Sequence, residues 1–326
     1  ERSVVKSHTA SPEAYQDYLQ GRFWFNKSTE EGFRKGIAYF QQAIEKDPAY
    51  ALAYAGLATS HSSLVRFVVL APKEGLSIAR EAALKALELD DTLSEAHALL
   101  GWIKAVYDWD WSGAEREFQR ADTLNSNDAS AKIIYGNSLL VMGRIERAAA
   151  KLERALELDP LSFDANLNVG LKFYFAGQSE QAIGHVQKTL ELDSNFIPGH
   201  VVLCLIYLQQ SKYQLAIDEI GKAVASFPNS TDGLSVLGYA YAVAGRKAEA
   251  QGVLDQLSVL SKQSYIPPGS TAMIYAALGE KDQAFEWLEK AFQDRSIFSV
   301  GPFAFVKLHP AYDPLRSDPR FADLLH

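Results

Sequence analysis

Apolar positions along this chain recur in pairs of short amphipathic segments, separated by small residues and turn formers. The clearest pair runs from Ala129 to Pro160, where apolar side chains return every three or four residues on both sides of Gly143. This spacing predicts two helices, each with one buried face. Gly143 can take the positive φ that ends the first helix, and Pro160 disfavours helical geometry in the residue before it. One such hairpin cannot bury its own apolar face, so we expect it to pack against a neighbour.

The same residue types return at a fixed step of 34 residues. Alanine recurs at this step from Ala148 to Ala284, and turn-forming residues recur at it from Gly143 to Gly279, a set that we call the turn column. In the middle of the first helix of a pair, a small residue recurs five times, and we call this set the small column: Gly136, Gly170, Cys204, Gly238 and Ala272. Glycine inside a helix costs about 1 kcal/mol relative to alanine, so these positions predict places where a neighbouring helix comes very close.

A period of 34 residues with helix–turn–helix content and these small columns is typical of tetratricopeptide repeats. We therefore predict an all-α, right-handed superhelical solenoid over residues 13–295. Residues 1–12 are expected to be a linker stub, and residues 296–326, which include Phe298, Phe303 and Phe305, are expected to cap the open end of the last hairpin. About eight repeats are expected, starting near residues 13, 51, 94, 129, 163, 197, 231 and 265.

Three stretches carry a narrower resemblance: SPEAYQDYLQGRFWFNKSTEEG, YDWDWSGAEREFQRA, and IYAALGEKDQAFEWLEKAF with the later DPLRSDPRFADLL. They resemble the C-terminal repeat regions of bacterial multidomain regulators. In that group a winged-helix, nucleotide cyclase or Ser/Thr kinase effector precedes the repeats, often with a TolB-like segment between. The resemblance implies a cytoplasmic, non-catalytic regulatory or sensor part in signalling or transcription regulation. Because the chain begins at Glu1 without a methionine, we expect it to be a piece of a longer protein.

Composition and charge narrow the possible partners. The chain has 326 residues, of which 48% are apolar and 22% charged, as in ordinary globular proteins. The net charge of −8 argues against nucleic acid as the main partner. No apolar run is long enough to predict a membrane span. The single cysteine, Cys204, excludes an internal disulfide framework, and its place in the small column favours a buried thiol. A monomer is favoured.

Motifs for catalysis, metals or cofactors are not found in the sequence. It contains no GxxxxGK or GxGxxG phosphate loop, no HExxH metal motif and no GxSxG nucleophile elbow. His97 and His200 fall at equivalent places in two repeats, which the solenoid period explains without a metal ion. Asp108 and Asp110 are better explained by a turn, with Asp110 as a helix N-cap, than by a cation site. We therefore expect a protein that is not an enzyme, with an unrecognised catalytic site as the least favoured hypothesis.

The resemblance also implies a binding surface, because the first helix of each hairpin lines the concave face in this family. Members that clamp a C-terminal carboxylate use Lys, Asn and Arg there. Apart from Arg22 and Asn137, this chain has aromatic or aliphatic residues at those places, so we do not expect it to bind heat-shock chaperone tails. Many of these rings could instead pack between helices. The predicted partner-binding residues are Tyr18, Arg22, Trp102, Ile133, Asn137, Leu171, Tyr174, Phe175, Leu205, Tyr239 and Met273.

Two alternatives stay open at this stage. An expanded turn carries Phe67, Val68, Val69 and Leu70, which either tuck under the second repeat or form an exposed docking patch. The groove could also sense a small ligand rather than a protein or peptide segment. A ligand sensor would have a deep closed cavity with a few convergent polar groups, whereas a peptide binder would have a long open groove.

Overall fold

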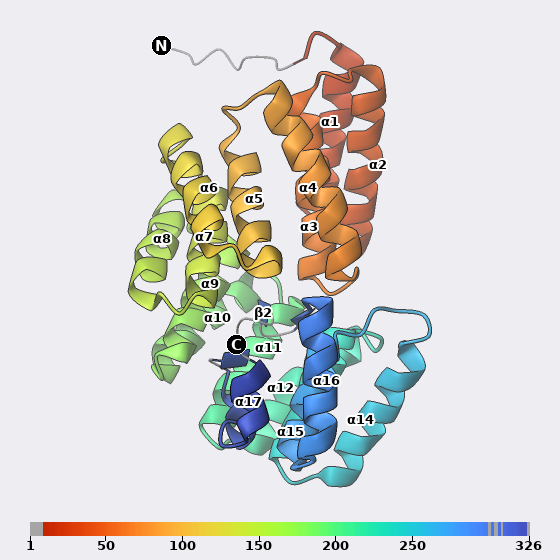
Figure 1. Ribbon diagram of the computed structural model, residues 1–326, viewed down its shortest axis with the longest axis vertical. Coiled ribbons are helices and arrows are strands. Elements are labelled where there is room, and N and C mark those ends of the chain that lie inside the picture. The colour runs from red at the N-terminus through yellow and green to blue at the C-terminus, as the bar shows by residue number, and fades with distance from the viewer. Residues whose placement is uncertain (1–8, 299–300, 303–305, 308, 325–326) are drawn as a thin grey trace. The chain divides into compact units, whose positions relative to one another are not determined.

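The computed structural model describes residues 9–298, 301–302, 306–307 and 309–324 (Figure 1). Eight helix pairs follow one another in this part of the chain, and a short π-helix, η1 (Lys104–Asp108), extends the fifth helix. The predicted all-α class and its repeated hairpins are confirmed. The pairs are α1 (Pro12–Phe25) with α2 (Glu30–Lys46), α3 (Ala51–Arg66) with α4 (Pro72–Leu89), α5 (Ser94–Ile103) with α6 (Trp111–Leu124), α7 (Ala129–Val141) with α8 (Ile145–Leu158), α9 (Phe163–Phe175) with α10 (Ser179–Leu192), α11 (Ile197–Gln209) with α12 (Tyr213–Ser226), α13 (Thr231–Val243) with α14 (Lys247–Leu260), and α15 (Pro268–Leu278) with α16 (Lys281–Asp294).

Most hairpins begin at the predicted residue. The first begins one residue earlier, at Pro12, and the last begins three residues later, at Pro268. Pro267 is the N-cap of α15 and has extended geometry, as expected for a residue that precedes proline.

The helices form two compact units, Glu1–Ile134 and Tyr135–His326, and each is described by itself. In unit 1, the first helices α1, α3 and α5 contact one another in order, and each packs against its own second helix. In unit 2, the first helices α9, α11, α13 and α15 do the same. We call the surface that these first helices form in each unit its first-helix face. The predicted division into a stub, one solenoid and a cap stays a prediction.

Local sequence explains where the helices begin and end. The Ser11 hydroxyl accepts a hydrogen bond from the Ala14 N–H, which caps α1. The Asp110 carboxylate caps α6 by accepting from the Gly113 N–H at 2.8 Å, and this bond lowers the pKa of Asp110. At the other end, Gly143 and three later members of its column adopt φ of 70–82°, the left-handed geometry that ends a helix. Ser211 takes the same geometry with a φ of 58°.

The column of small residues marks close helix contacts, as its spacing predicts. A Cβ atom added at Gly136 would lie 2.7 Å from Cδ2 of Leu152 on the second helix of the same pair. One added at Gly170 would lie 2.7 Å from Cγ2 of Val186. Cys204, in the same column, is fully buried, and burial raises the pKa of its thiol. These positions are small because the neighbouring side chain occupies the space that a larger residue would need.

Residues 296–326, which we call the tail, lie in unit 2. In this segment β1 (Ile297–Phe298) pairs antiparallel with β2 (Gly301–Pro302). A 3₁₀-helix, η3 (Pro310–Leu315), contacts α15, and the last helix, α17 (Pro319–Leu324), contacts α16 (Figure 1). Phe321 is buried there, whereas the predicted capping residues Phe303 and Phe305 lie outside the described residues. The tail therefore packs on both helices of the last pair.

Candidate functional site

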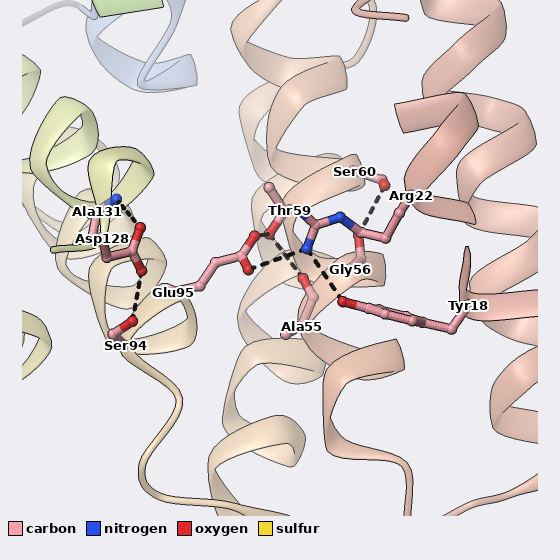
Figure 2. Close-up of polar contacts among 10 residues, drawn as sticks. All are labelled: Tyr18, Arg22, Ala55, Gly56, Thr59, Ser60, Ser94, Glu95, Asp128 and Ala131. Carbon is pink, nitrogen blue, oxygen red and sulfur yellow. Dashed lines mark hydrogen bonds and ion pairs between the residues drawn. The ribbon is translucent and has the colours of Figure 1, made fainter. Parts of the chain in front are cut away.

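Arg22 is at the centre of a polar network on the first-helix face of unit 1 (Figure 2). Its Nη1 atom donates a hydrogen bond to the Tyr18 hydroxyl at 3.2 Å, one helical turn earlier on α1. The same atom lies 3.9 Å from a carboxylate oxygen of Glu95 on α5. From α3, the Thr59 hydroxyl lies 3.2 Å from the other Glu95 oxygen and 2.8 Å from the Ala55 carbonyl. The ion pair thus joins α1 to α5, and the Thr59 hydroxyl joins α3 to the same carboxylate.

Asp128 continues this row at the start of α7. One of its carboxylate oxygens accepts from the Ala131 N–H at 3.0 Å, as expected for a helix N-cap. The other accepts from the Ser94 hydroxyl of α5 at 2.6 Å (Figure 2). Asp128 therefore links α5 to α7 through a side chain that also stabilises the start of α7. We call Tyr18, Arg22, Thr59, Ser94, Glu95 and Asp128 the polar row.

Opposite charges in the polar row partly compensate for burial. Burial raises the pKa of Glu95, Arg22 lowers it, and the Asp128 carboxylate raises it again. Burial alone would lower the pKa of Arg22, but Glu95 and Tyr18 outweigh this effect and raise it. The guanidinium therefore stays charged. Because 42% of the Arg22 side chain is exposed and its described contacts run through Nη1, Nε and Nη2 keep donor capacity for a further ligand.

The polar row offers charged and neutral hydrogen-bonding groups to a ligand. It presents a charged donor and carboxylate and hydroxyl acceptors that neighbouring groups already hold in place. Among the residues described, no group of three or more His, Cys, Asp or Glu side chains is placed to hold a metal ion. No described helix is both long and apolar enough to cross a membrane.

The structure brings together part of the predicted surface of unit 1. Tyr18 and Arg22 are in direct contact, as members of one network. Trp102 and Ile133 are buried and contribute to packing. Thr59 and Glu95 were not identified from the sequence. Ser94 and Glu95 resemble an ordinary helix start with an acidic first turn, so the pattern gave no reason to place Glu95 on the binding face.

The predicted residues of unit 2 have a different environment. Leu205, Tyr239 and Met273 are buried, as is Tyr174, whereas Asn137, Leu171 and Phe175 are half-buried. The tail accounts for part of this burial. The ring of His309 lies 6.4 Å from that of Tyr174, and the Tyr312 hydroxyl donates to the Gly269 carbonyl of α15 at 3.1 Å. This first-helix face is in contact with a segment of the same chain.

The expanded turn after α3 offers little exposed apolar surface. Val68 is buried, and Phe67, Val69 and Leu70 are half-buried. The Phe67 ring packs against Phe33 at 5.1 Å between ring centroids. Val68 has a φ of 61°, which is an uncommon conformation for a β-branched residue. A docking role for these four residues stays a prediction.

The two equivalent histidines each link the two helices of one pair. Nδ1 of His97 lies 2.8 Å from Glu117, and Nδ1 of His200 lies 2.6 Å from Glu219. Nε2 of His200 faces the Ser194 carbonyl at 2.9 Å, so both of its ring nitrogens face acceptors. The hydrogen bond with Glu219 raises the pKa of His200 although burial opposes it. This arrangement favours a charged imidazolium in a structural ion pair.

Two family models, both described as tetratricopeptide repeat, match the chain, one over residues 136–195 and 203–257 and the other over residues 272–293. The transcriptional regulator HilA of Salmonella typhimurium is 27% identical over 143 residues. That match covers 44% of this chain and 26% of HilA, so the chain matches about a quarter of the length of this relative. HilA of Salmonella typhi matches to the same extent.

Solved structures share the fold at low sequence identity. The human IFIT1 dimer with m7Gppp-AAAA has a TM-score of 0.66 and 15% identity, with 86% of this chain and 72% of that chain covered. The Cut9–Hcn1 hetero-tetramer of the APC/C has a TM-score of 0.52 and 19% identity, with 70% and 46% covered. At these identities the likeness concerns the fold alone.

Proposed function

We propose that this chain, whose repeats belong to the tetratricopeptide family, is a non-catalytic module that binds a protein or peptide segment. The repeats imply an interaction role, and no enzyme family is indicated. We further propose that it is the regulatory or sensor part of a larger bacterial signalling or transcription regulator. The similarity to HilA, which is a transcriptional regulator, supports this context. A full-length gene that encodes no effector domain beside the repeats would contradict it.

The polar row of unit 1 is the observation that carries the proposed binding role. Tyr18, Arg22, Thr59 and Glu95 come from three first helices, so a segment lying across them would meet groups from several repeats. Arg22 is the strongest candidate anchor because it is charged, half-exposed and held by two neighbours. A guanidinium held in this way binds carboxylate and carbonyl oxygens without losing much further side-chain entropy.

A protein segment fits this surface better than RNA does. The IFIT1 structures contain a capped or triphosphorylated RNA end, which makes RNA the alternative to test. The present chain has a net charge of −8, and Glu95 and Asp128 place two carboxylates beside Arg22. A phosphate backbone would meet these carboxylates, which oppose its binding.

The test is to select peptides from a random display library on the wild-type protein and then measure their affinity for two variants. Arg22→Ala removes the proposed anchor. Arg34→Ala is the matched control, because Arg34 lies in the same unit on the second helix α2 and forms an exposed ion pair with Glu30. A hydrogen bond with a charged group contributes about 1.5–3 kcal/mol, so we expect Arg22→Ala to weaken binding about tenfold or more. The control should bind like wild type.

Selected peptides that bind Arg22→Ala as tightly as wild type would refute the assignment of this face. Hydrogen exchange of α1 to α6 must show that both variants fold, since a disrupted unit 1 would also lose binding. A capped RNA oligonucleotide forms the second arm of the experiment. RNA that binds more tightly than any selected peptide, and loses affinity in Arg22→Ala, would assign the surface to RNA instead.

A further inference from the structure

The part of the tail around η3 lies against the first-helix face of unit 2, whereas α17 contacts α16. The Tyr312 hydroxyl donates to the Gly269 carbonyl at the start of α15, and the His309 ring lies beside Tyr174 of α9. This segment is also one of the best-buried stretches of the tail. Its fully buried side chains are Val306, His309, Tyr312 and Leu315.

The electrostatic environment of two tyrosines shows how far this segment reaches. Burial raises the pKa of both Tyr174 on α9 and Tyr239 on α13, and the Asp313 carboxylate raises both further. Tyr239 in turn raises the pKa of Tyr312, after burial. The tail residues around Asp313 therefore lie close to first helices of three different repeats, α9, α13 and α15.

The end of the solenoid is covered by a different part of the tail. Arg320, on α17, donates to Asp282 at 2.9 Å, and its guanidinium lies 4.2 Å from the centroid of the Phe285 ring. Both partners belong to α16. The helix α17 therefore covers part of α16 and contributes to the cap of the last hairpin. Residues 309–315 also reach beyond the last hairpin, to Tyr174 of α9, which a cap of that hairpin does not require.

His309 has one buried ring nitrogen that lacks a hydrogen-bond partner among the described residues. Its Nδ1 accepts from the Ala311 N–H at 3.1 Å, so in the neutral ring Nε2 carries the proton. Nε2 is buried and has no hydrogen-bond partner among the described residues. A buried donor without an acceptor costs the docked state free energy, which release of the segment returns because water then solvates the ring. The docked segment is thus tightly packed, but the unpaired Nε2 atom lowers the stability of the docked state.

We propose that the first-helix face of unit 2 is a second binding site, for a protein segment with a tyrosine anchor, and that residues 309–315, together with Val306, fill this site in cis. The partner's tyrosine takes the place of Tyr312 and donates its hydroxyl to the Gly269 carbonyl. The tethered segment competes at a high effective concentration, so an external segment binds only when the tail is weakened or displaced. This site is separate from the polar row and does not depend on it.

The test uses the full chain and a labelled synthetic peptide of residues 306–324 as the external segment. Tyr312→Asp forces a charge into the buried seat, which should release the tail and open the site. Tyr312→Phe removes the hydroxyl and keeps the ring. Tyr213→Phe is the control, because Tyr213 lies exposed on α12 of the same unit. Peptide binding is measured by fluorescence anisotropy, with circular dichroism as the check that the helices remain.

We expect weak peptide binding to wild type and Tyr213→Phe. The apparent affinity should be about fivefold higher for Tyr312→Phe, since one neutral hydrogen bond holding the tail is lost. It should be highest for Tyr312→Asp. A peptide with the same Tyr-to-Asp change should not bind, and exchange of tails between two copies, seen as dimers by ultracentrifugation, would also support the site.

Two results would overturn the proposal. The first is a folded Tyr312→Asp protein that does not bind the peptide, which would make residues 309–315 a purely structural part of the cap. If Tyr312→Asp loses its helices, Tyr312→Phe decides the matter. A Tyr312→Phe protein with the same peptide affinity as wild type then refutes competition between the tail and an external segment.

Discussion

The ring of Phe40 is fully buried between two glycines, so one added methyl group tests the packing beneath the polar row. Gly21 on α1 and Gly56 on α3 face the ring from opposite helices, and a Cβ atom at either would lie 2.6 Å from its Cε1. The ring cannot move away from one glycine without approaching the other. Either substitution must therefore separate α1 from α3 or distort the ring.

Two opposing terms set the magnitude for Gly56→Ala. Replacing glycine by alanine inside a helix stabilises by about 1 kcal/mol, whereas overpacking a full core costs about 1–3 kcal/mol. We expect a net loss of up to about 2 kcal/mol in unit 1. The double variant Gly21→Ala, Gly56→Ala should lose more than the sum of the single changes, by about 0.5 kcal/mol or more, because both methyl groups press on one ring.

Gly252→Ala is the matched control. Gly252 lies inside α14, is exposed, and has nothing within 4 Å of an added Cβ atom, so alanine should stabilise this helix. Because repeat arrays do not unfold in one step, the assay is local hydrogen exchange in α1 to α4, with urea unfolding as the global measure. If Gly56→Ala slows hydrogen exchange in α1 to α4 as Gly252→Ala slows it in α14, then the Phe40 ring is not closely packed against Gly56. Tyr18 packs against Phe40 with 5.9 Å between centroids, so the damaging variant should also weaken peptide binding at Arg22.

Three further predictions concern pH and capping. The pKa of folded His200 is raised, so its stabilising pair with Glu219 is complete below about pH 6.5 and lost as pH rises through the folded pKa. The melting temperature should fall over that window, and less so in Glu219→Gln. Burial lowers the pKa of His309 to about 3, so between that pH and about 6.5 the released state binds a proton that the docked state does not. As pH falls through that range, the protection factors of residues 309–315 should drop by up to tenfold per pH unit, and a pH-independent value would contradict the buried neutral ring. Asp128→Ala should cost about 0.5–2 kcal/mol through loss of the α7 cap, read as faster exchange at the start of α7.

The sequence predicted the repeats well because each carries its own signal. Gly136 and Gly170 stand 34 residues apart, and each faces a side chain of its own second helix, Leu152 or Val186. Such a contact is local to one hairpin, so it must recur with the period of the repeat. The starts of most helices followed from the same register.

The polar row and the seat of the tail could not be found in this way. Thr59 and Glu95 meet because two side chains from different repeats turn toward each other, which the period of the repeats does not encode. The 3₁₀-helix η3 is short and contains Pro310 and Pro314, so it has neither the length nor the spacing that reveals a buried face. Its partners lie far back in the sequence, as the bond from Tyr312 to Gly269 shows.

The two first-helix faces therefore call for different mutational tests. Tyr174 and Tyr239 are aromatic residues at positions typical of a binding groove, yet both are buried beside the tail, so a charge placed there would remain in a desolvated seat. Loss of a partner in such a variant would report release of the tail or damage to unit 2, and would not identify a contact. Arg22 is half-exposed and keeps free donors, and exchange in α1 to α6 reports whether loss of its ion pair with Glu95 disturbs the surrounding packing. A binding defect in Arg22→Ala with unchanged exchange in α1 to α6 is therefore the result that assigns a partner to this chain.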